Sequence, residues 1–445
     1  MRQVEVAIIG AGASGLMAAL TAAEEQKKQH RPVSVLLLES AQKPGRKLLA
    51  TGNGRCNLVN ARMEPSRFHG DVWEAQMVLE NYPPAAVVRR FQSLGLLCRE
   101  EDEGRVYPNN GQASAVLNTL LYHLSALGVE ILCQWPVTSL IKEGKWFRIV
   151  SSTAEKELLA EKVVLASSGK AAPQLGSDGS GYPLAQKLGH SLTPCFPALV
   201  PVCCDKKRVR GLQGMRARGK VSLWQGKTRI GEESGEIQFT EYGLSGICVF
   251  QLSRHMAKWQ EEGASSPPMV LVLDLMPDMP EQELTALLRY RQRILPSSGA
   301  ADALSGIINQ KVGQQIIRES IENAGRLLKE LSPKELETVA RRVKHFSFPI
   351  TGVQDWSRAQ VTAGGIPLKE LIPETLESKK CPGLYLCGEI LNLDGDCGGY
   401  NLHWAWASGM TAGKAAAKSL LTQTAKPQKS SSHSKIRRKP HAANR

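Results

Sequence analysis

The sequence predicts an α/β fold in which one dinucleotide-binding domain is interrupted by an inserted β-barrel and a small helical subdomain. Three observations favour this fold. Residues 4–39 follow the pattern strand, glycine turn, helix, strand and acid; short strands separated by glycine turns follow from residue 194; and glycine-bounded apolar strands return after residue 355. A chain of 445 residues is long enough for two or three such units.

A glycine-rich turn follows the first predicted strand. Residues 4–9 are an unbroken apolar run, typical of a strand buried on both faces of a parallel sheet. Gly10, Gly12 and Gly15 follow with the spacing GxGxxG, and apolar residues then recur with helical period. Gly10 makes the tight turn, Gly12 lets the backbone approach a pyrophosphate, and Gly15 lets helix and strand pack closely. The start of the helix then offers free N–H groups to the phosphates.

The second predicted strand ends in an acid at the place where a dinucleotide site needs one. The strand in "VSVLLLES" ends at Glu39, 24 residues after Gly15, where a carboxylate binds the ribose hydroxyls of adenosine. The same carboxylate would repel a 2′-phosphate, which disfavours NADP at this site. Alone, Glu39 reads as an ordinary charge at a strand end. With the preceding motif, the dinucleotide site is the better interpretation.

Residues 43–60, "KPGRKLLATGNGRCNLVN", form a loop rich in glycine and cations. Glycines let a backbone approach a ligand closely, and interleaved cations suit an anionic ligand. The residues concerned are Gly45, Arg46, Lys47, Gly52, Gly54 and Arg55. A flexible basic loop without a ligand is the alternative.

The rest of the chain changes pattern at several points, which gives the predicted boundaries. They are 1–193 and 355–421 for the dinucleotide-binding domain, 194–277 for the inserted barrel, 278–344 for the helical subdomain, 345–354 for a strand returning to the barrel, and 422–445 for a disordered basic tail. In the helical part, Ser332, Pro333 and Glu335 have the pattern of a helix start with a capping box. Nothing after Gly15 repeats the dinucleotide motif, so a second, nicotinamide-binding domain is not expected.

Charge is concentrated at the end of the chain. The net charge is +14, and residues 422–445 hold seven Lys or Arg and no acid, which is half of the excess. With almost no apolar side chains, this tail is predicted to stay disordered. A solubilising role is the simpler interpretation, and a weak electrostatic contact with RNA or anionic lipid is the alternative.

Cysteine usage favours a reducing compartment. Ten cysteines are scattered without any CxxC pair, and only Cys203 and Cys204 are adjacent, which excludes a disulfide framework and a zinc ribbon. We therefore expect reduced thiols in the cytoplasm and no metal site. The apolar N-terminal segment is not expected to span a membrane, because Glu5 and the three glycines interrupt it.

Several long motifs occur in the order found in a known family. They include "VAIIGAGASGLMAAL", "GRKLLATGNGRCNLVN", "GRVYPNNGQAS", "QVTAGGIP" and "GLYLCGEILNLDGDCGGYNLHWAWASGMTAG". From about residue 4 to 420 the chain resembles the BaiN-like flavoproteins, FAD-dependent oxidoreductases also called HI0933-like or aminoacetone oxidase-like. The resemblance implies a Rossmann-type FAD-binding domain of the glutathione reductase and fumarate reductase kind, with inserted barrel and helical subdomains.

The resemblance also assigns residues to the cofactor. It implies that the FAD pyrophosphate lies on the first glycine turn, the adenosine ribose at Glu39, and the flavin ring at the start of a late helix. The cofactor-binding residues that it implies are Gly10, Gly12, Ala13, Ser14, Gly15, Glu39, Arg46, Lys47, Gly54, Arg55, Cys56, Asn57, Gly388, Glu389, Gly399, Tyr400, Asn401 and Leu402.

Two departures from the family pattern concern the substrate side. Ser168 stands where the family usually has glycine, so its side chain is expected to crowd a close approach, and His403 stands where glutamine is common. By position, Tyr400, His403 and Cys56 are the candidate proton donors, with packing as the alternative role of each.

The predicted function is that of an FAD-dependent oxidoreductase. It would reduce, or oxidise, a small or hydrophobic organic substrate by hydride transfer at flavin N5, with NADH or NADPH as candidate electron donor. Reduction of conjugated C=C bonds in steroid ketones is the activity proposed for some relatives. The alternatives are an FAD-dependent RNA-modifying protein and a non-catalytic flavin-binding sensor. No stable nucleic-acid partner is expected, and the oligomeric state stays open.

Overall fold

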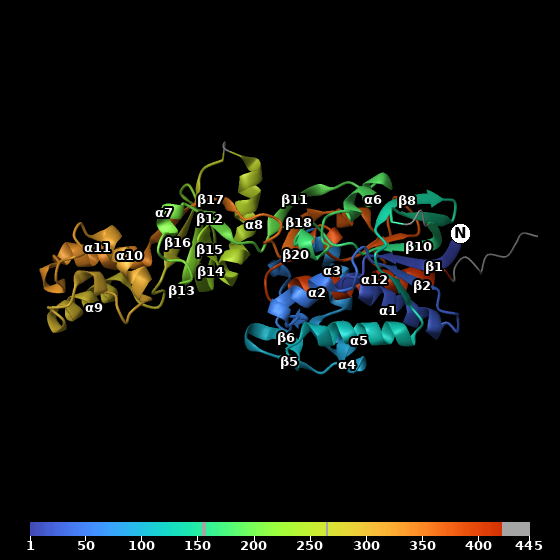
Figure 1. Ribbon diagram of the computed structural model, residues 1–445, viewed down its shortest axis with the longest axis horizontal. Helices are drawn as coiled ribbons and strands as arrows, with labels where there is room; N and C mark the ends of the chain where they lie inside the picture. Colours follow the sequence, from blue (N-terminus) through green and yellow to red (C-terminus); the bar gives the residue numbers. More distant parts are fainter. Residues whose placement is uncertain (154–156, 264–265, 421–445) are drawn as a thin grey trace, which may run out of the picture.

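The computed structural model describes residues 1–153, 157–263 and 266–420. Figure 1 shows three bodies in a row: the α/β domain, the barrel, and a group of helices at the far end. The predicted tail, residues 422–445, lies outside the described residues. The chain enters the barrel after the first part of the α/β domain and returns after the helices, which confirms the predicted fold class.

A largely parallel sheet forms the centre of the α/β domain. Its order is β7-β2-β1-β10, with β19 beside one half of β10 and the antiparallel strands β9 and β8 beside the other. The strands are β1 (Arg2–Ile9), β2 (Val35–Leu38), β7 (Glu130–Leu132), β8 (Val137–Glu143), β9 (Trp146–Ser151), β10 (Glu157–Leu165) and β19 (Leu384–Leu386). All of β2 and most of β1 is buried, as the unbroken apolar runs predict.

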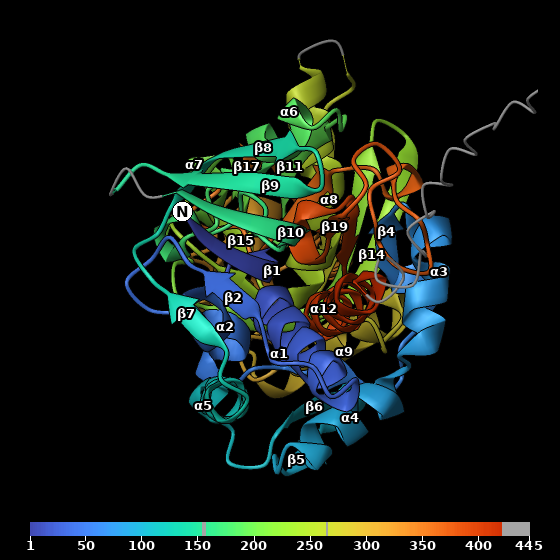
Figure 2. The same cartoon turned by 90° about the vertical axis from the view of Figure 1, so that its right-hand side faces the viewer.

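The first and the last helix of the described chain pack against each other on one face of this sheet. Figure 2 shows α1 (Ala13–Lys28) and α12 (Tyr400–Ser419) side by side. Small residues permit the close approach, because a Cβ added to Gly409 or Gly413 of α12 would lie within 2.5 Å of an α1 carbonyl oxygen. This contact joins the two ends of an interrupted domain.

The remaining elements of the α/β domain surround this core. They are α2 (Arg46–Ala50), β3 (Val59–Asn60), β4 (Phe68–Gly70), α3 (Val72–Asn81), α4 (Pro84–Ser93), β5 (Cys98–Glu100), β6 (Arg105–Pro108), α5 (Ala113–Ala126), α6 (Gly181–Lys187) and β20 (Leu393–Gly395).

Replacing Gly413 by alanine is expected to lower the free energy of unfolding by about 2 kcal/mol, since overpacking a close helix contact forces the backbones apart. Its Cβ would lie 2.2 Å from the Ala18 carbonyl oxygen. Urea unfolding followed by circular dichroism measures the change. Lys414→Ala, at an exposed position of the same helix, is the control and should stay within about 0.5 kcal/mol. Equal stability of the two variants would contradict the packing described.

The inserted strands close into a barrel in the order β12-β15-β14-β13-β16-β17. They are β12 (Val202–Cys204), β13 (Arg216–Gln225), β14 (Thr228–Phe239), β15 (Gly243–Ser245), β16 (Met269–Asp274) and β17 (Phe346–Val353). Alternate side chains point inward, so Phe346 and Phe348 are buried and their ring centroids lie 4.7 Å apart. Helix α8 (Ile247–Glu262) packs between this barrel and the α/β domain.

A group of helices follows β16 and precedes β17. It comprises α9 (Glu281–Ile294), α10 (Gln310–Ser320) and α11 (Pro333–Lys344). The predicted capping box at α11 is confirmed, because Ser332 Oγ accepts from Glu335 N at 3.3 Å and Ser332 N donates to Glu335 Oε2 at 2.8 Å. Among the described residues, no helix combines the length and apolar character that crossing a membrane requires.

One strand does not follow the sequence reading. The run "PALVPVCC" reads as a single barrel strand, but it divides between β11 (Thr193–Ala198) and β12. Strand β11 pairs with β18 (Val361–Gly365) in a separate sheet, and only β12 joins the barrel. Leu199, with φ +51°, and Pro201 separate the two strands. Segments that are far apart in sequence, such as Ala198 and Val361 (361 − 198 = 163 residues), thus meet at the entrance to the insertion.

Candidate functional site

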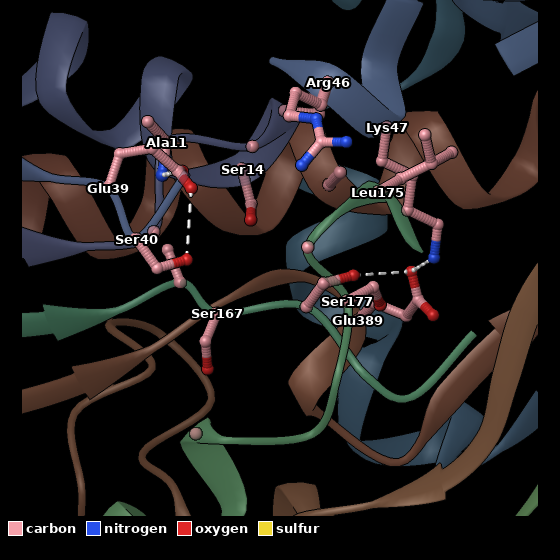
Figure 3. Close-up of a pocket in the computed structure, with 18 of the residues that line it drawn as sticks. Ala11, Ser14, Glu39, Ser40, Arg46, Lys47, Ser167, Leu175, Ser177 and Glu389 are labelled. Atoms are coloured by element: carbon pink, nitrogen blue, oxygen red, sulfur yellow. Dashed lines mark hydrogen bonds and ion pairs between the residues drawn. The ribbon is translucent and has the colours of Figure 1, made fainter. Parts of the chain in front are cut away.

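A pocket lies at the carboxyl ends of β1, β2 and β10, where parallel strands of such sheets commonly present a ligand site (Figure 3). Both parts of the interrupted domain line it. The first part supplies residues 9–14, 38–40, 45–48, 51, 135–138, 166–168, 175–178, 180, 181 and 184, and the second part supplies residues 360, 361, 389, 393, 401, 402, 404 and 405. The predicted glycine turn and the predicted late helix therefore belong to one site.

The turn between β1 and α1 leaves open space at Gly12. A Cβ added to Gly12 would have no atom of the described chain within 4 Å, whereas one added to Gly15 would lie 1.8 Å from the Gly10 carbonyl oxygen. Helix α1 begins at Ala13 without a side-chain cap from any described residue. Its first N–H groups consequently lack the usual partner. Open space beside uncapped N–H groups fits a pyrophosphate.

Glu39 is held in the pocket wall by main-chain donors. Ala11 N donates to its Oε2 at 2.9 Å, and Ala41 N donates to its Oε1 at 2.8 Å. Figure 3 shows Glu39 and Ala11 together at one side of the pocket. A carboxylate fixed in this way beside the glycine turn has the position that an adenosine ribose requires.

Replacing Glu39 by glutamine is expected to weaken FAD binding about tenfold, because one of the two acceptor oxygens becomes an amide that cannot bind a hydroxyl proton. That amide would also face a main-chain N–H instead of accepting from it. Fluorescence titration of the apoprotein with FAD measures the affinity. Glu100→Gln, at an exposed position of β5, is the matched control. An unchanged dissociation constant for Glu39→Gln would contradict the ribose assignment.

Glu389 is the centre of a second polar network in the pocket wall. Lys47 Nζ and Ser168 Oγ donate to its Oε2 at 2.6 and 3.0 Å. Thr362 donates to its Oε1 twice, from the main-chain N at 3.0 Å and from Oγ1 at 2.9 Å. Figure 3 shows the Lys47 side chain reaching toward this carboxylate. The network joins α2, the segment after β10, and β18 around one acid.

Ser168 therefore has a role that the sequence did not indicate. Its side chain was expected to crowd a close approach, but its hydroxyl group binds Glu389. Thr362 was missed altogether. The sequence held one sign of their role: both are small polar residues next to buried strands, Ser168 just after β10 and Thr362 within β18.

Ser167 presents an unsatisfied polar atom at the pocket. Its Oγ is buried and has no hydrogen-bond partner among the residues that the structure describes. A buried hydroxyl without a partner costs about 1–3 kcal/mol unless a ligand or water satisfies it. Together with the space at Gly12 and the fixed carboxylates, this orphan hydroxyl shows that the pocket fits a polar dinucleotide such as FAD.

The start of α12 forms the other end of the site. Gly399 has φ +102°, and a Cβ there would lie 2.5 Å from the Val59 carbonyl carbon, so only glycine fits. Asn401 closes the preceding turn, because its Oδ1 accepts from Gly395 N at 2.9 Å and its Nδ2 donates to the Gly395 carbonyl oxygen at 2.6 Å. Asn401 and Leu402 line the pocket.

The predicted cofactor-binding residues divide into two groups. Those that line the pocket are Gly10, Gly12, Ala13, Ser14, Glu39, Arg46, Lys47, Glu389, Asn401 and Leu402. Those that do not line it are Gly15, Gly54, Arg55, Cys56, Asn57, Gly388, Gly399 and Tyr400. Several of the second group shape the wall without facing it; a Cβ on Gly388, for example, would lie 2.3 Å from Ser14 Oγ.

The three candidate proton donors are all buried outside the pocket wall. Burial raises the pKa of the Cys56 thiol to about 12 and lowers the pKa of His403 to about 4. Tyr400 is 3% exposed and packs edge-on against Phe68, with ring centroids 5.3 Å apart. Each therefore packs in the core in this structure, because proximity in sequence to a pocket residue does not make a side chain face the pocket, and the role of each as a proton donor stays a prediction.

The family model for the HI0933-like protein Rossmann domain matches residues 4–415. A relative from Clostridium scindens, the 3-dehydro-bile acid delta(4,6)-reductase, is 38% identical over 93% of this chain and 99% of its own length. The ribosomal RNA dihydrouridine synthase of Escherichia coli is 26% identical over 92% of this chain and 96% of its own length.

A solved structure shares the fold at low sequence identity. The 3-ketosteroid delta1-dehydrogenase of Sterolibacterium denitrificans has a TM-score of 0.52 and is 13% identical, with 94% of this chain and 100% of that chain covered. The family model and the Clostridium scindens relative each span almost the whole chain, which confirms the resemblance and, with the fit of the pocket, the FAD cofactor. The chain therefore belongs to the HI0933-like family, and it is an FAD-dependent oxidoreductase.

Proposed function

We propose that this protein reduces a C=C bond conjugated with a carbonyl group in a hydrophobic ring substrate. The observation that carries the proposal is the 38% identity, over nearly the full length of both chains, to a relative named as a reductase of a 3-dehydro-bile acid. That relative's name describes reduction at positions 4 and 6, and the oxidised carbon at position 3 is the carbonyl group. A 3-oxo-4-ene steroid is therefore the substrate class to test first.

Residues of both parts of the domain would hold the cofactor. The turn at Gly12 and the start of α1 would bind the pyrophosphate, Glu39 the ribose, and Arg46 and the Glu389 network the middle of the molecule. Bound FAD supplies the hydride from its N5 atom. The uncapped start of α12 favours negative charge at its end of the pocket, since helix N-termini carry partial positive charge.

NADH or NADPH is the electron donor that we propose. Anaerobic mixing of the purified protein with either nucleotide, followed by absorbance near 450 nm, tests the donor through bleaching of the flavin. Testosterone, a 3-oxo-4-ene steroid, is then added, and mass spectrometry is expected to show a product heavier by two hydrogens. Gly12→Val, which should lack FAD, is the control for adventitious reduction. A reduced flavin that no conjugated ketone reoxidises would refute the proposal.

Reduction of uridine in ribosomal RNA is a second candidate, favoured by the two more distant relatives named ribosomal RNA dihydrouridine synthases. Uridine also contains a C=C bond conjugated with a carbonyl group, so the chemistry is the same. This candidate predicts RNA binding that weakens steeply with salt. Contacts to phosphate are strong at about 50 mM salt. If RNA does not bind the protein under that condition, this candidate is eliminated.

The sensor function and the cellular location are also proposals. A flavin-binding sensor would be yellow and would be reduced by neither nicotinamide nucleotide, so the same anaerobic experiment separates it from a reductase. All ten cysteines are free, which supports a reducing cytoplasm as the location.

A further inference from the structure

Helix α8 of the insertion lies against the chain segment that leads into α12. Gln251 Oε1 of α8 accepts from Cys397 N at 2.8 Å, and Phe250 packs on the apolar cluster that contains Val361. Val361, Leu393 and Asn401 line the pocket. The junction between the insertion and the α/β domain is thus adjacent to the end of the pocket near the start of α12.

Two oppositely charged side chains meet in this junction without satisfying each other. Asp394, on β20, is 4% exposed, and Arg254, on α8, lies with Nη1 3.5 Å from Asp394 Oδ2. This distance suits an ion pair, but the geometry does not make a hydrogen bond. Within the described part of the chain, Arg254 Nη1 and Asp394 Oδ1 are both buried and both lack a hydrogen-bond partner.

The neighbouring Asp396, in contrast, has a hydrogen-bond partner for each of its carboxylate oxygens. Asp396 Oδ2 accepts from Arg67 Nη1 at 3.1 Å, and its Oδ1 lies 3.0 Å from His69 Nε2. Both oxygens of Asp396 have partners, while Oδ1 of Asp394 has none among the described residues. An unpaired buried polar atom costs about 1–3 kcal/mol, so the Asp394–Arg254 pair is poorly explained by stability alone.

Asp394 is able to act as a donor near neutral pH. The pKa of its carboxyl is raised to about 7, mainly by burial and partly by the nearby Asp396 and Glu389, against the opposing effect of the Arg254 guanidinium. His69 faces this position from the paired strand β4, and Arg67 is bound to Asp396. Below about pH 7 the carboxyl is mostly protonated, and the junction then holds two donors, Arg254 Nη1 and the Asp394 carboxyl, for which the described residues offer no acceptor.

We propose that Arg254 and Asp394 bind the carbonyl oxygen of the substrate. The inference rests on the proposed function, a conjugated ketone being the ligand class. When hydride adds to the far carbon of the C=C bond, the electron pair of that bond moves toward the carbonyl oxygen, which becomes negative before the remaining carbon takes up a proton. Neither side chain lines the pocket, but Leu393, next to Asp394, does, so a carbonyl group at this end of the pocket would lie beside two buried donors that stabilise the developing charge. The insertion and the α/β domain each supply one of them.

The test measures binding to the oxidised holoprotein without a reductant, so that no turnover occurs. The probes are testosterone and androst-4-en-17β-ol, which differ only in the ketone at position 3, and isothermal titration calorimetry gives both affinities. The wild type is expected to prefer testosterone at least tenfold at pH 6. Arg254→Met and Asp394→Leu should bind both probes equally. Arg216→Met, at an exposed site of β13 in the same insertion, should keep the wild-type preference.

A conservative variant separates donation from packing. Asp394→Asn keeps a donor at every pH, so its preference for testosterone should persist between pH 6 and 8.5. The wild-type preference should fade over the same range as Asp394 loses its proton. Flavin absorbance confirms that each variant is folded and loaded; should Arg254→Met fail to load, the two pH profiles still decide the question.

The outcomes distinguish this inference from the proposed function. If the wild type reduces testosterone and the variants keep its preference for the ketone, or if the wild-type and Asp394→Asn pH profiles coincide, the carbonyl assignment is overturned and the proposed function stands. If the wild type neither binds nor reduces testosterone, both fail together. Loss of the preference in Arg254→Met and Asp394→Leu, with retention in Asp394→Asn, supports the assignment.

Discussion

Gly15→Ala is expected to lower the free energy of unfolding by about 3 kcal/mol, at the upper end of what overpacking usually costs. A Cβ at Gly15 would lie 1.8 Å from the Gly10 carbonyl oxygen and 3.2 Å from the Ala166 Cβ. Neither neighbour can move freely. Gly10 itself has φ +104° and is hydrogen-bonded to the Leu38 carbonyl oxygen, and Ala166 follows the central strand β10.

Urea unfolding of the apoproteins measures this change without the contribution of bound FAD. Gly12→Ala is the matched control, because it makes the same chemical change in the same turn at a site where a Cβ has no neighbour within 4 Å in the described chain. It should unfold within about 0.5 kcal/mol of the wild type. If the two variants are equally stable, Gly15 does not have the packing role described.

The parts of the site that the sequence could predict are those fixed by local geometry. The glycine turn, the strand before it and the helix after it are consecutive, and each glycine has a steric reason that depends on atoms a few residues away. Glu39 follows because the next parallel strand must lie beside the first. Asn401 and Leu402 line the pocket, since a helix start after a strand and a glycine turn is again local, and their contact with the cofactor stays a prediction.

The parts that could not be predicted depend on contacts between distant segments. Thr362 meets Glu389 only because β18, after the whole insertion, returns beside the turn that follows β19, and Arg254 meets Asp394 across 140 residues of chain. Strand β11 belongs to the sheet of β18 for the same reason. Neither periodicity nor spacing specifies which inserted helix will lie against the pocket.

The candidate proton donors show a second limit. The resemblance assigns Cys56 itself to the cofactor, and His403 directly follows the assigned Leu402, yet both are fully buried. On a helix or in a tight turn, adjacent residues point in different directions, so a motif that fixes the backbone near a ligand does not fix which side chains face it. At Cys56 the backbone has φ +60°, a turn conformation that directs the thiol into the core.

Gly12→Val is expected to fold like the wild type and to lose FAD, with affinity at least 100-fold lower. Gly12 has φ −81° and ψ −169°, an extended conformation that valine adopts without strain, and the added atoms enter open space. That space is where the pyrophosphate must lie to reach the N–H groups of α1, so the valine methyl groups and the phosphate oxygens would compete for it.

Two measurements on one preparation separate folding from binding. Circular dichroism of the apoproteins should give melting temperatures within about 2 °C of each other, since a change below 0.5 kcal/mol moves Tm by that amount or less in a chain of this size. The absorbance of the purified protein near 450 nm should be lost. Ser14→Ala, which removes a hydroxyl group in the same turn and adds no bulk, should retain FAD. The start of α1 does not have room for both the valine side chain and the phosphates. A yellow, stoichiometrically loaded Gly12→Val protein would therefore show that the phosphates bind elsewhere.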